Sequence, residues 1–243
     1  KAKRVEIKNL NRSDWIKLFI YGLLFIAFTQ GAMFTGLLFL PAVTVSLWLN
    51  FTPLVVAVLA IFLIKEYPTI RQWGGVLLFI AGIVIYFFPI VLSENQEIGL
   101  IAMTIGVLAN SGSSVLGRSI NREAKINPVL VTIVSMGVGA IVLLISGTLI
   151  QGLPSISLQN VLYLLWLAVI NTALAFTIWN YTLRTLSAME SSIINGTMLI
   201  QIAVLAWIFL GEAISLQEGI GMLIAAIGAL LVQMKIKSNP LAK

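Results

Sequence analysis

Long apolar runs separated by short polar connections form the pattern along this chain. An α-helix rises about 1.5 Å per residue, so about 20 apolar residues cross the ~30 Å hydrocarbon core of a bilayer. The runs are continuous and lack the alternation of apolar and polar positions typical of membrane strands. They predict eight membrane-spanning helices, over residues 16–40, 44–64, 73–92, 98–117, 128–151, 161–183, 188–210 and 216–234.

The composition agrees with this pattern. Hydrophobic residues make up 59% of the 243 residues and charged residues only 10%, whereas soluble domains are about 25% charged. The chain has no cysteine and no histidine, which excludes disulfides, thiolate or imidazole metal sites and triads built on either residue. We therefore predict an all-α, polytopic helical membrane protein with no cofactor and no bound metal.

The basic residues predict the orientation. All 15 lysines and arginines fall on one side of the eight predicted spans. Because loops rich in lysine and arginine stay in the cytoplasm, both termini are expected there, in a multi-pass protein of the cell inner membrane. The net charge of +6 then belongs to the membrane surface, and no nucleic-acid partner is expected.

The chain also repeats itself at an offset of 146 residues. Residues 15–85 overlay 161–231 with 14 identities in 71 positions. The offset spans five predicted helices, so the two copies should cross the membrane in opposite directions, which is typical of secondary transporters. The matched polar and small residues are Glu66 with Glu212, Gly75 with Gly221, and Gly82 with Gly228.

This repeat predicts the domain organisation. The first copy covers 1–92 and holds three helices, the second covers 98–234 and holds five, and 235–243 is a cytoplasmic tail. The symmetry of two five-helix repeats predicts two further helices, formed by about 50 residues that would precede Lys1 in the native protein.

The segment between Leu37 and Gly82 resembles the drug/metabolite transporter superfamily, specifically its EamA-type bacterial permeases. The resemblance lies in Pro53 after a polar cluster, the helix-ending Glu66, and the glycines of the next span. The second copy repeats the pattern, with Leu199 in place of Pro53. The resemblance implies ten helices in two five-helix repeats, and export or exchange of small metabolites without ATP hydrolysis.

Amide side chains inside the spans indicate a candidate site. A buried amide without a partner costs several kcal/mol in a membrane, so these residues face other helices or a wet cavity. Asn50 shares a helix face with Pro53, whose missing N–H loosens the helix, and Asn110 lies in a stripe of small residues. Hydrogen bonding between helices and lining of a cavity are both left open. The predicted substrate-binding residues are Gln30, Phe34, Asn50, Asn110, Thr177, Asn180 and Asn195.

Other positions are predicted to be structural. Capping boxes should begin helices at Thr69, Ser187 and Ser215, which makes Glu190 a capping residue, with proton relay as the alternative. Glycines at helical spacing should let helices approach closely. A helix-ending glutamate opposes the helix dipole and needs a local partner. The structural set is Pro53, Glu66, Gly75, Gly82, Glu212, Gly221 and Gly228.

These features together predict a secondary transporter that exports or exchanges a small metabolite, such as an amino acid, by alternating access. A multidrug exporter or a flippase for lipid-linked compounds is an alternative. A membrane-embedded enzyme is the alternative from another class, although Glu190 is the one acid near membrane depth, and we predict no enzyme activity. Expected partners are a small-molecule substrate and the bilayer, with a homodimer left open.

Overall fold

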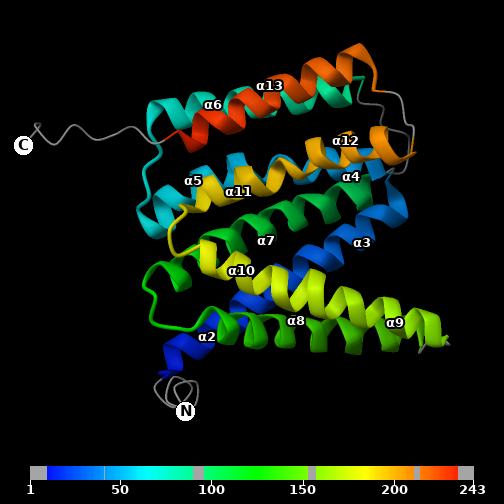
Figure 1. The fold of residues 1–243 in the computed structure, drawn as a ribbon. Helices are drawn as coiled ribbons and strands as arrows, with labels where there is room; N and C mark the ends of the chain where they lie inside the picture. Colours follow the sequence, from blue (N-terminus) through cyan, green and yellow to red (C-terminus); the bar gives the residue numbers. More distant parts are fainter. Residues whose placement is uncertain (1–9, 41, 90–95, 153–156, 211–213, 235–243) are drawn as a thin grey trace, which may run out of the picture.

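A computed structural model of the chain describes residues 10–40, 42–89, 96–152, 157–210 and 214–234. These residues form helices and connections, with no strand among them. Figure 1 shows the helices lying roughly alongside one another, with α6 and α13 on one side of the bundle and α8 and α9 on the other. The helices in chain order are α2 (Arg12–Gly22), η1 (Leu23–Phe28), α3 (Thr29–Phe39), α4 (Ala42–Leu49), α5 (Thr52–Ile64), α6 (Ile70–Phe87), α7 (Glu97–Arg122), α8 (Pro128–Gln151), α9 (Leu158–Trp166), η2 (Leu167–Leu174), α10 (Ala175–Thr182), α11 (Ala188–Gly196), α12 (Met198–Leu210) and α13 (Leu216–Gln233); η1 and η2 are π-helical.

The helices agree with a multi-pass membrane protein. Seven described segments are long and apolar enough to cross a bilayer. The predicted span 188–210 is not among the seven, and two shorter helices, α11 and α12, follow one another there. The seven segments are Arg12–Phe39, Thr44–Ile64, Ile70–Phe87, Glu97–Arg122, Pro128–Ile150, Leu158–Thr182 and Leu216–Gln233.

The predicted capping boxes are confirmed. Thr69, Ser187 and Ser215 each accept a hydrogen bond from the third helical amide, and Gln or Glu at that position accepts one from the cap in return. Glu190 is thus a capping residue, with its carboxylate 2.9 Å from the Ser187 amide nitrogen. A further capping box at Asn11 begins α2.

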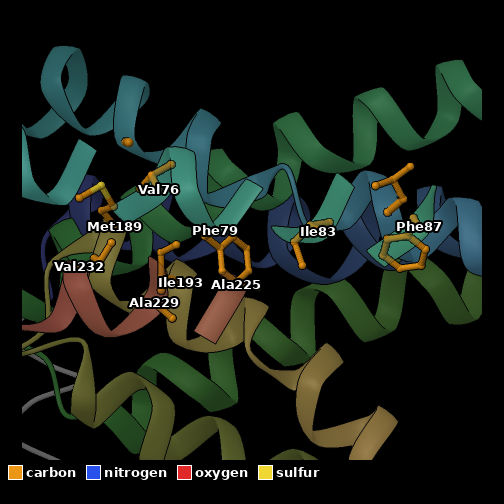
Figure 2. Packing of buried hydrophobic residues seen from close by; sticks show 11 residues of the cluster. Val76, Phe79, Ile83, Phe87, Met189, Ile193, Ala225, Ala229 and Val232 are labelled. Carbon is orange, nitrogen blue, oxygen red and sulfur yellow. The ribbon is translucent and has the colours of Figure 1, made fainter. Parts of the chain in front are cut away.

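Helices α6 and α13 pack along a seam of glycines, and Figure 2 shows buried hydrophobic residues of both helices. A β-carbon added to Gly75 would lie 2.8 Å from the carbonyl oxygen of Gly228. One added to Gly221 would lie 2.8 Å from the carbonyl oxygen of Gly82. Real β-carbons do not approach backbone so closely, so the two backbones can meet only because these four residues are glycine.

The largest buried cluster lies beside this seam. Phe79 and Ile83 of α6 are almost fully buried against Ala225 of α13 and Ile193 of α11. On the opposite side of the bundle, α9 and η2 contain no buried residue.

Candidate functional site

A helix interruption divides the span of residues 44–64. Helix α4 ends at Leu49 and α5 begins at Thr52. Between them Phe51 has φ −79° and ψ −12°, and the Asn50 amide donates to carbonyls both three and four residues earlier. Pro53 lies in the first turn of α5, where its missing N–H costs nothing. The loosening predicted from Pro53 is therefore present, and it takes the form of two consecutive helices.

A second interruption divides residues 188–210 without a proline. Helix α11 ends at Gly196 and α12 begins at Met198, and Thr197 between them has φ −68° and ψ −10°. Close packing accompanies this interruption, since a β-carbon at Gly196 would lie 2.8 Å from the ring of Phe79. The Thr197 hydroxyl donates to the Ile194 carbonyl at 2.7 Å, and the Thr197 backbone amide donates to the same carbonyl at 3.2 Å.

The two interruptions lie next to each other in the bundle. The side-chain oxygen of Asn50 is 3.7 Å from the position that a β-carbon on Gly196 would occupy. Asn50 is 7% exposed, and its side-chain nitrogen donates to the Ser46 carbonyl at 2.8 Å. The side-chain nitrogen of Asn50 therefore bonds to a backbone carbonyl at the first interruption, and the side-chain oxygen faces the second interruption.

Helix α7 contributes the next polar group. The Asn110 side-chain nitrogen lies 3.4 Å from the hydroxyl of Thr52, the first residue of α5. The neighbouring Ser111 hydroxyl is 3.5 Å from the Thr52 carbonyl. Asn50 and Asn110 are thus brought to the same place, the start of α5. Asn195 is exposed and lies in the last turn of α11, two residues before Thr197.

Thr177 and Asn180 of α10 lie in a different cluster. Asn180 is 1% exposed and makes four hydrogen bonds. Its oxygen accepts from Asn121 at 2.9 Å and from Tyr21 at 3.5 Å, and its nitrogen donates to Thr132 at 3.1 Å and to a backbone carbonyl of α10. Thr177 lies 3.4 Å from the same Thr132 hydroxyl. This cluster joins α2, α7, α8 and α10.

Asn121 was not foreseen from the sequence. It is fully buried, and its side-chain oxygen has no hydrogen-bond partner among the described residues. The apolar run predicted a helix ending at residue 117, whereas α7 continues to Arg122. The signal that could have found Asn121 is its spacing four residues after Gly117, on the same face as the small residues of α7.

The remaining two predicted residues lie on α3. Gln30 is half-buried and its side chain forms no hydrogen bond with the described part of the chain, and Phe34 is 59% exposed. The structure therefore brings together Asn50 and Asn110, places Thr177 and Asn180 in one network, and does not join Gln30, Phe34 or Asn195 to either group.

A cluster of ionic contacts closes one end of the bundle. The Glu66 carboxylate pairs with Arg118 at 2.9 Å and accepts from the Ala188 amide at 3.1 Å. Lys65 adopts a left-handed conformation with φ 55°, which turns Glu66 out of α5. Its carboxylate therefore meets the positive N-terminus of α11 instead of the negative end of its own helix. The partner of Glu66 that the sequence could not name is this pair, Arg118 and Ala188. Glu212 lies outside the described residues.

Further arginine contacts tie the same end together. Arg118 also donates to the Leu183 carbonyl at 2.8 Å, and Arg122 donates to the Ile64 carbonyl at 3.1 Å. These bonds connect α7 with the end of α5 and with the connection between α10 and α11. We call this end of the bundle, which carries Glu66, Arg118, Arg122 and Arg184, the basic end.

The groups around the interruptions are amides, hydroxyls and backbone carbonyls. Such groups hold a ligand by hydrogen bonds and carry no charge at neutral pH. No group of three residues able to hold a metal ion occurs in the described ranges. The arrangement is suited to reversible binding of a small polar or amphipathic molecule between helices.

Comparisons with known proteins agree with this architecture. The model of the EamA-like transporter family matches residues 2–88 and 97–234. A chloroplastic WAT1-related protein of Arabidopsis thaliana is 23% identical over 229 residues, which are 90% of this chain and 54% of the relative. The chain thus spans about half the length of that curated relative. A solved crystal structure shares the fold with a TM-score of 0.75 and 18% identity, over 93% of this chain and 77% of the other. Since the family model spans most of the sequence, this chain belongs to the EamA-like transporter family, within the drug/metabolite transporter superfamily.

Proposed function

We propose that this protein is a secondary transporter that exports or exchanges a small metabolite by alternating access. The observation that carries the proposal is the pair of helix interruptions at Asn50–Phe51 and at Thr197, which face each other beside Asn110. Interrupted helices leave backbone groups free inside a membrane, and this is tolerated where those groups line a cavity or bind a ligand.

Two inverted repeats would provide the moving parts of such a transporter. The helix bounds support the 146-residue offset: α5 and α12 match at both ends, and so do α6 and α13. Both π-helical segments also end at matching residues, Phe28 and Leu174. Phe51 and Thr197 are related by the same offset and have nearly the same φ and ψ.

The glycine seam supports the opposite orientation of the copies. Gly75 meets Gly228, and Gly82 meets Gly221. By the repeat alignment, Gly221 is the counterpart of Gly75 and Gly228 the counterpart of Gly82. Gly75 therefore meets the counterpart of Gly82, and Gly82 meets the counterpart of Gly75. A two-fold axis between two copies produces such a reciprocal contact. We therefore propose repeats over 1–92 and 98–234, followed by the tail 235–243.

The proposed orientation places the basic end on the cytoplasmic side of a bacterial-type inner membrane. The three arginines of the basic end come from two separate parts of the sequence, α7 and the connection after α10, and lie together in the fold. The bonds between Glu66, Arg118 and Ala188 would hold this end closed in the state seen here. Rocking of one repeat against the other would open it.

A transport assay in proteoliposomes tests the proposal. Purified protein would be reconstituted and supplied with labelled amino acids, nucleobases and organic cations. We expect Asn50→Ala and Asn110→Ala to abolish the uptake seen with the unaltered chain, while the melting temperature stays within a few degrees. The matched control is Asn171→Ala, because Asn171 is an exposed amide in η2, away from both interruptions.

One result would contradict the binding role of Asn50 and Asn110, and another would contradict the transport function. If Asn50 and Asn110 only join helices, both alanine variants will transport normally and lose about 0.6–2 kcal/mol of stability, the range for such bonds. Uptake no faster than in protein-free vesicles, for every class of compound supplied, would contradict the transport function for those classes.

A further inference from the structure

A surface pocket of about 430 Å³ lies at the basic end, between α8 and α10. Its walls come from the first turn of α8, with Pro128 and Val129, and from the last two turns of α10, with Thr177 and Tyr181. Figure 1 shows these two helices side by side. The pocket is separate from the helix interruptions, which belong to α4–α5 and α11–α12. Thr177, predicted to line a central cavity, lines this peripheral pocket.

Arg184 is the charged residue of the pocket wall. One guanidinium nitrogen, Nη2, donates to the Ile126 carbonyl at 2.9 Å, and the ring of Tyr181 lies 5.7 Å from the guanidinium carbon. The Nε atom is buried and has no hydrogen-bond partner among the described residues. The guanidinium is therefore held in place beside the pocket, and its buried Nε–H has no acceptor among the described residues.

Arg184 also has no counter-ion within the described part of the chain. The ion pairs found there join Arg118 to Glu66 and Lys125 to Glu123. Arg118, at the same end of the bundle, shows the usual outcome for a half-buried arginine, a carboxylate at 2.9 Å. An arginine without a carboxylate beside an open pocket can accept a phosphate, whose oxygens match the guanidinium fork.

The surroundings of the pocket indicate where that phosphate comes from. The span Leu158–Thr182 ends two residues before Arg184, so the pocket lies at the depth of lipid headgroups. The exposed residues Leu174, Ile178 and Tyr181 follow one another along one face of η2 and α10, directly away from Arg184. An acyl chain can lie along this apolar face while the headgroup reaches the guanidinium.

We propose that the pocket at Arg184 binds the headgroup of an anionic phospholipid from the leaflet at the basic end. The phosphate accepts hydrogen bonds from the guanidinium and supplies its missing counter-ion. Basic pockets between helices at the cytoplasmic side are suited to such lipids. Lipid binding at this pocket does not depend on the transported substrate, and it can be tested independently of the transport function.

Lipid binding can be measured on the purified full chain by native mass spectrometry and by thermal melting in detergent. The probes are phosphatidylglycerol, phosphatidylcholine and inorganic phosphate. We expect phosphatidylglycerol to bind and to raise the melting temperature, with phosphatidylcholine and inorganic phosphate having little effect. Arg184→Gln should weaken phosphatidylglycerol binding about tenfold.

The matched control is Lys125→Gln, which removes the same charge from an exposed side chain near the pocket. It should change phosphatidylglycerol binding by less than about twofold, since Lys125 is not part of the pocket wall. Val129→Phe narrows the pocket and leaves Arg184 unchanged, so it should also weaken binding. This second variant keeps the test valid if Arg184→Gln folds poorly.

Three outcomes would overturn the proposal. Equal loss of binding in Lys125→Gln and Arg184→Gln would mean that the lipid responds to general surface charge. If Val129→Phe and Arg184→Gln each bind phosphatidylglycerol as tightly as the unaltered chain, the lipid does not use the pocket. Stabilisation by inorganic phosphate equal to that by phosphatidylglycerol would mean that the ligand is a soluble anion and not a lipid.

Discussion

The α6–α13 seam and the α9–η2 segment are both strongly apolar, yet one is packed and the other is not. Residues of α6 and α13 form much of the largest buried cluster, whereas α9 and η2 contain no buried residue. Both segments belong to candidate membrane spans. Apolar composition therefore does not decide which helices associate in this protein.

The two segments also differ in their small residues. Helices α6 and α13 carry glycines seven residues apart on the packed face, and α9–η2 has no glycine between Leu158 and Leu174. Lipid tails are as apolar as leucine, so burial against another helix gains little by itself. Close backbone approach and polar contacts are what favour helix association in a bilayer.

The largest effect is expected from filling the seam. Gly82→Leu places a side chain where the backbone of Gly221 and Ala225 now lies. Because backbone cannot move aside as a flexible side chain can, we expect a loss of about 3 kcal/mol or more, with poor recovery of folded protein. Size-exclusion chromatography and thermal melting would measure this loss.

The same helix supplies the control for this substitution. A β-carbon on Gly74 would meet nothing within 4 Å, so Gly74→Leu should change stability by no more than about 0.5 kcal/mol. Equal destabilisation by the two substitutions would show that glycine is needed for the helix itself and not for the seam.

A smaller effect is expected from the polar network that anchors α10. Asn180→Ala removes four hydrogen bonds, among them those with Asn121 and Thr132, and leaves the buried Tyr21 hydroxyl without its acceptor. We expect a loss of about 1–3 kcal/mol, since buried polar groups are left unsatisfied. In a double-mutant cycle with Asn121→Ala, the two losses should be clearly non-additive. Additive losses would mean that the network is not coupled.

A still smaller effect is expected on α9. Leu162 is 60% exposed, and Leu162→Ala should lower stability by less than about 0.5 kcal/mol in a lipid environment. The comparison is Ile83→Ala in the buried cluster, where Ile83 is 1% exposed and a loss of about 2 kcal/mol or more is expected. Similar losses at both positions would show that α9 has a partner in the membrane.

The smallest effect is expected at the ion pair of Glu123 and Lys125. The hydrogen bond and the charge of Lys125 lower the pKa of Glu123, so any stabilisation is present above the ordinary pKa of the carboxyl and is lost as pH falls through the lowered value. Both side chains are exposed, so water screens the pair. The melting temperature of Glu123→Gln should follow that of the unaltered chain between about pH 4 and pH 8. A melting temperature clearly higher for the unaltered chain at neutral pH, with the difference closing as the pH falls, would show a stronger pair.

The local pattern was enough to predict most of the helices. The apolar runs indicated where the chain crosses the membrane, because every backbone group inside a bilayer must be satisfied within a helix. The capping boxes at Thr69, Ser187 and Ser215 were also readable, since each depends on residues three positions apart. Pro53 indicated the first interruption for the same local reason.

Features that depend on distant residues could not be predicted in this way. The second interruption has no proline and coincides with close packing of Gly196 against Phe79. Glu66 meets Arg118 and Ala188, which lie 52 and 122 residues further along the chain. The sequence showed that Asn180 carries an amide, which suits a cavity. Its place in a buried network depends on α2, α7 and α8, which pack around it.

By itself, the sequence determined the class of protein, the course of its helices and the glycines able to form a seam, because these follow from hydropathy and from short-range hydrogen bonding. The tertiary structure decided which polar groups share a site, which arginine has a counter-ion and which does not, and which apolar helix is packed. The physical reason is that these outcomes depend on distances between residues far apart in the chain, and hydrophobicity in a membrane specifies none of those distances.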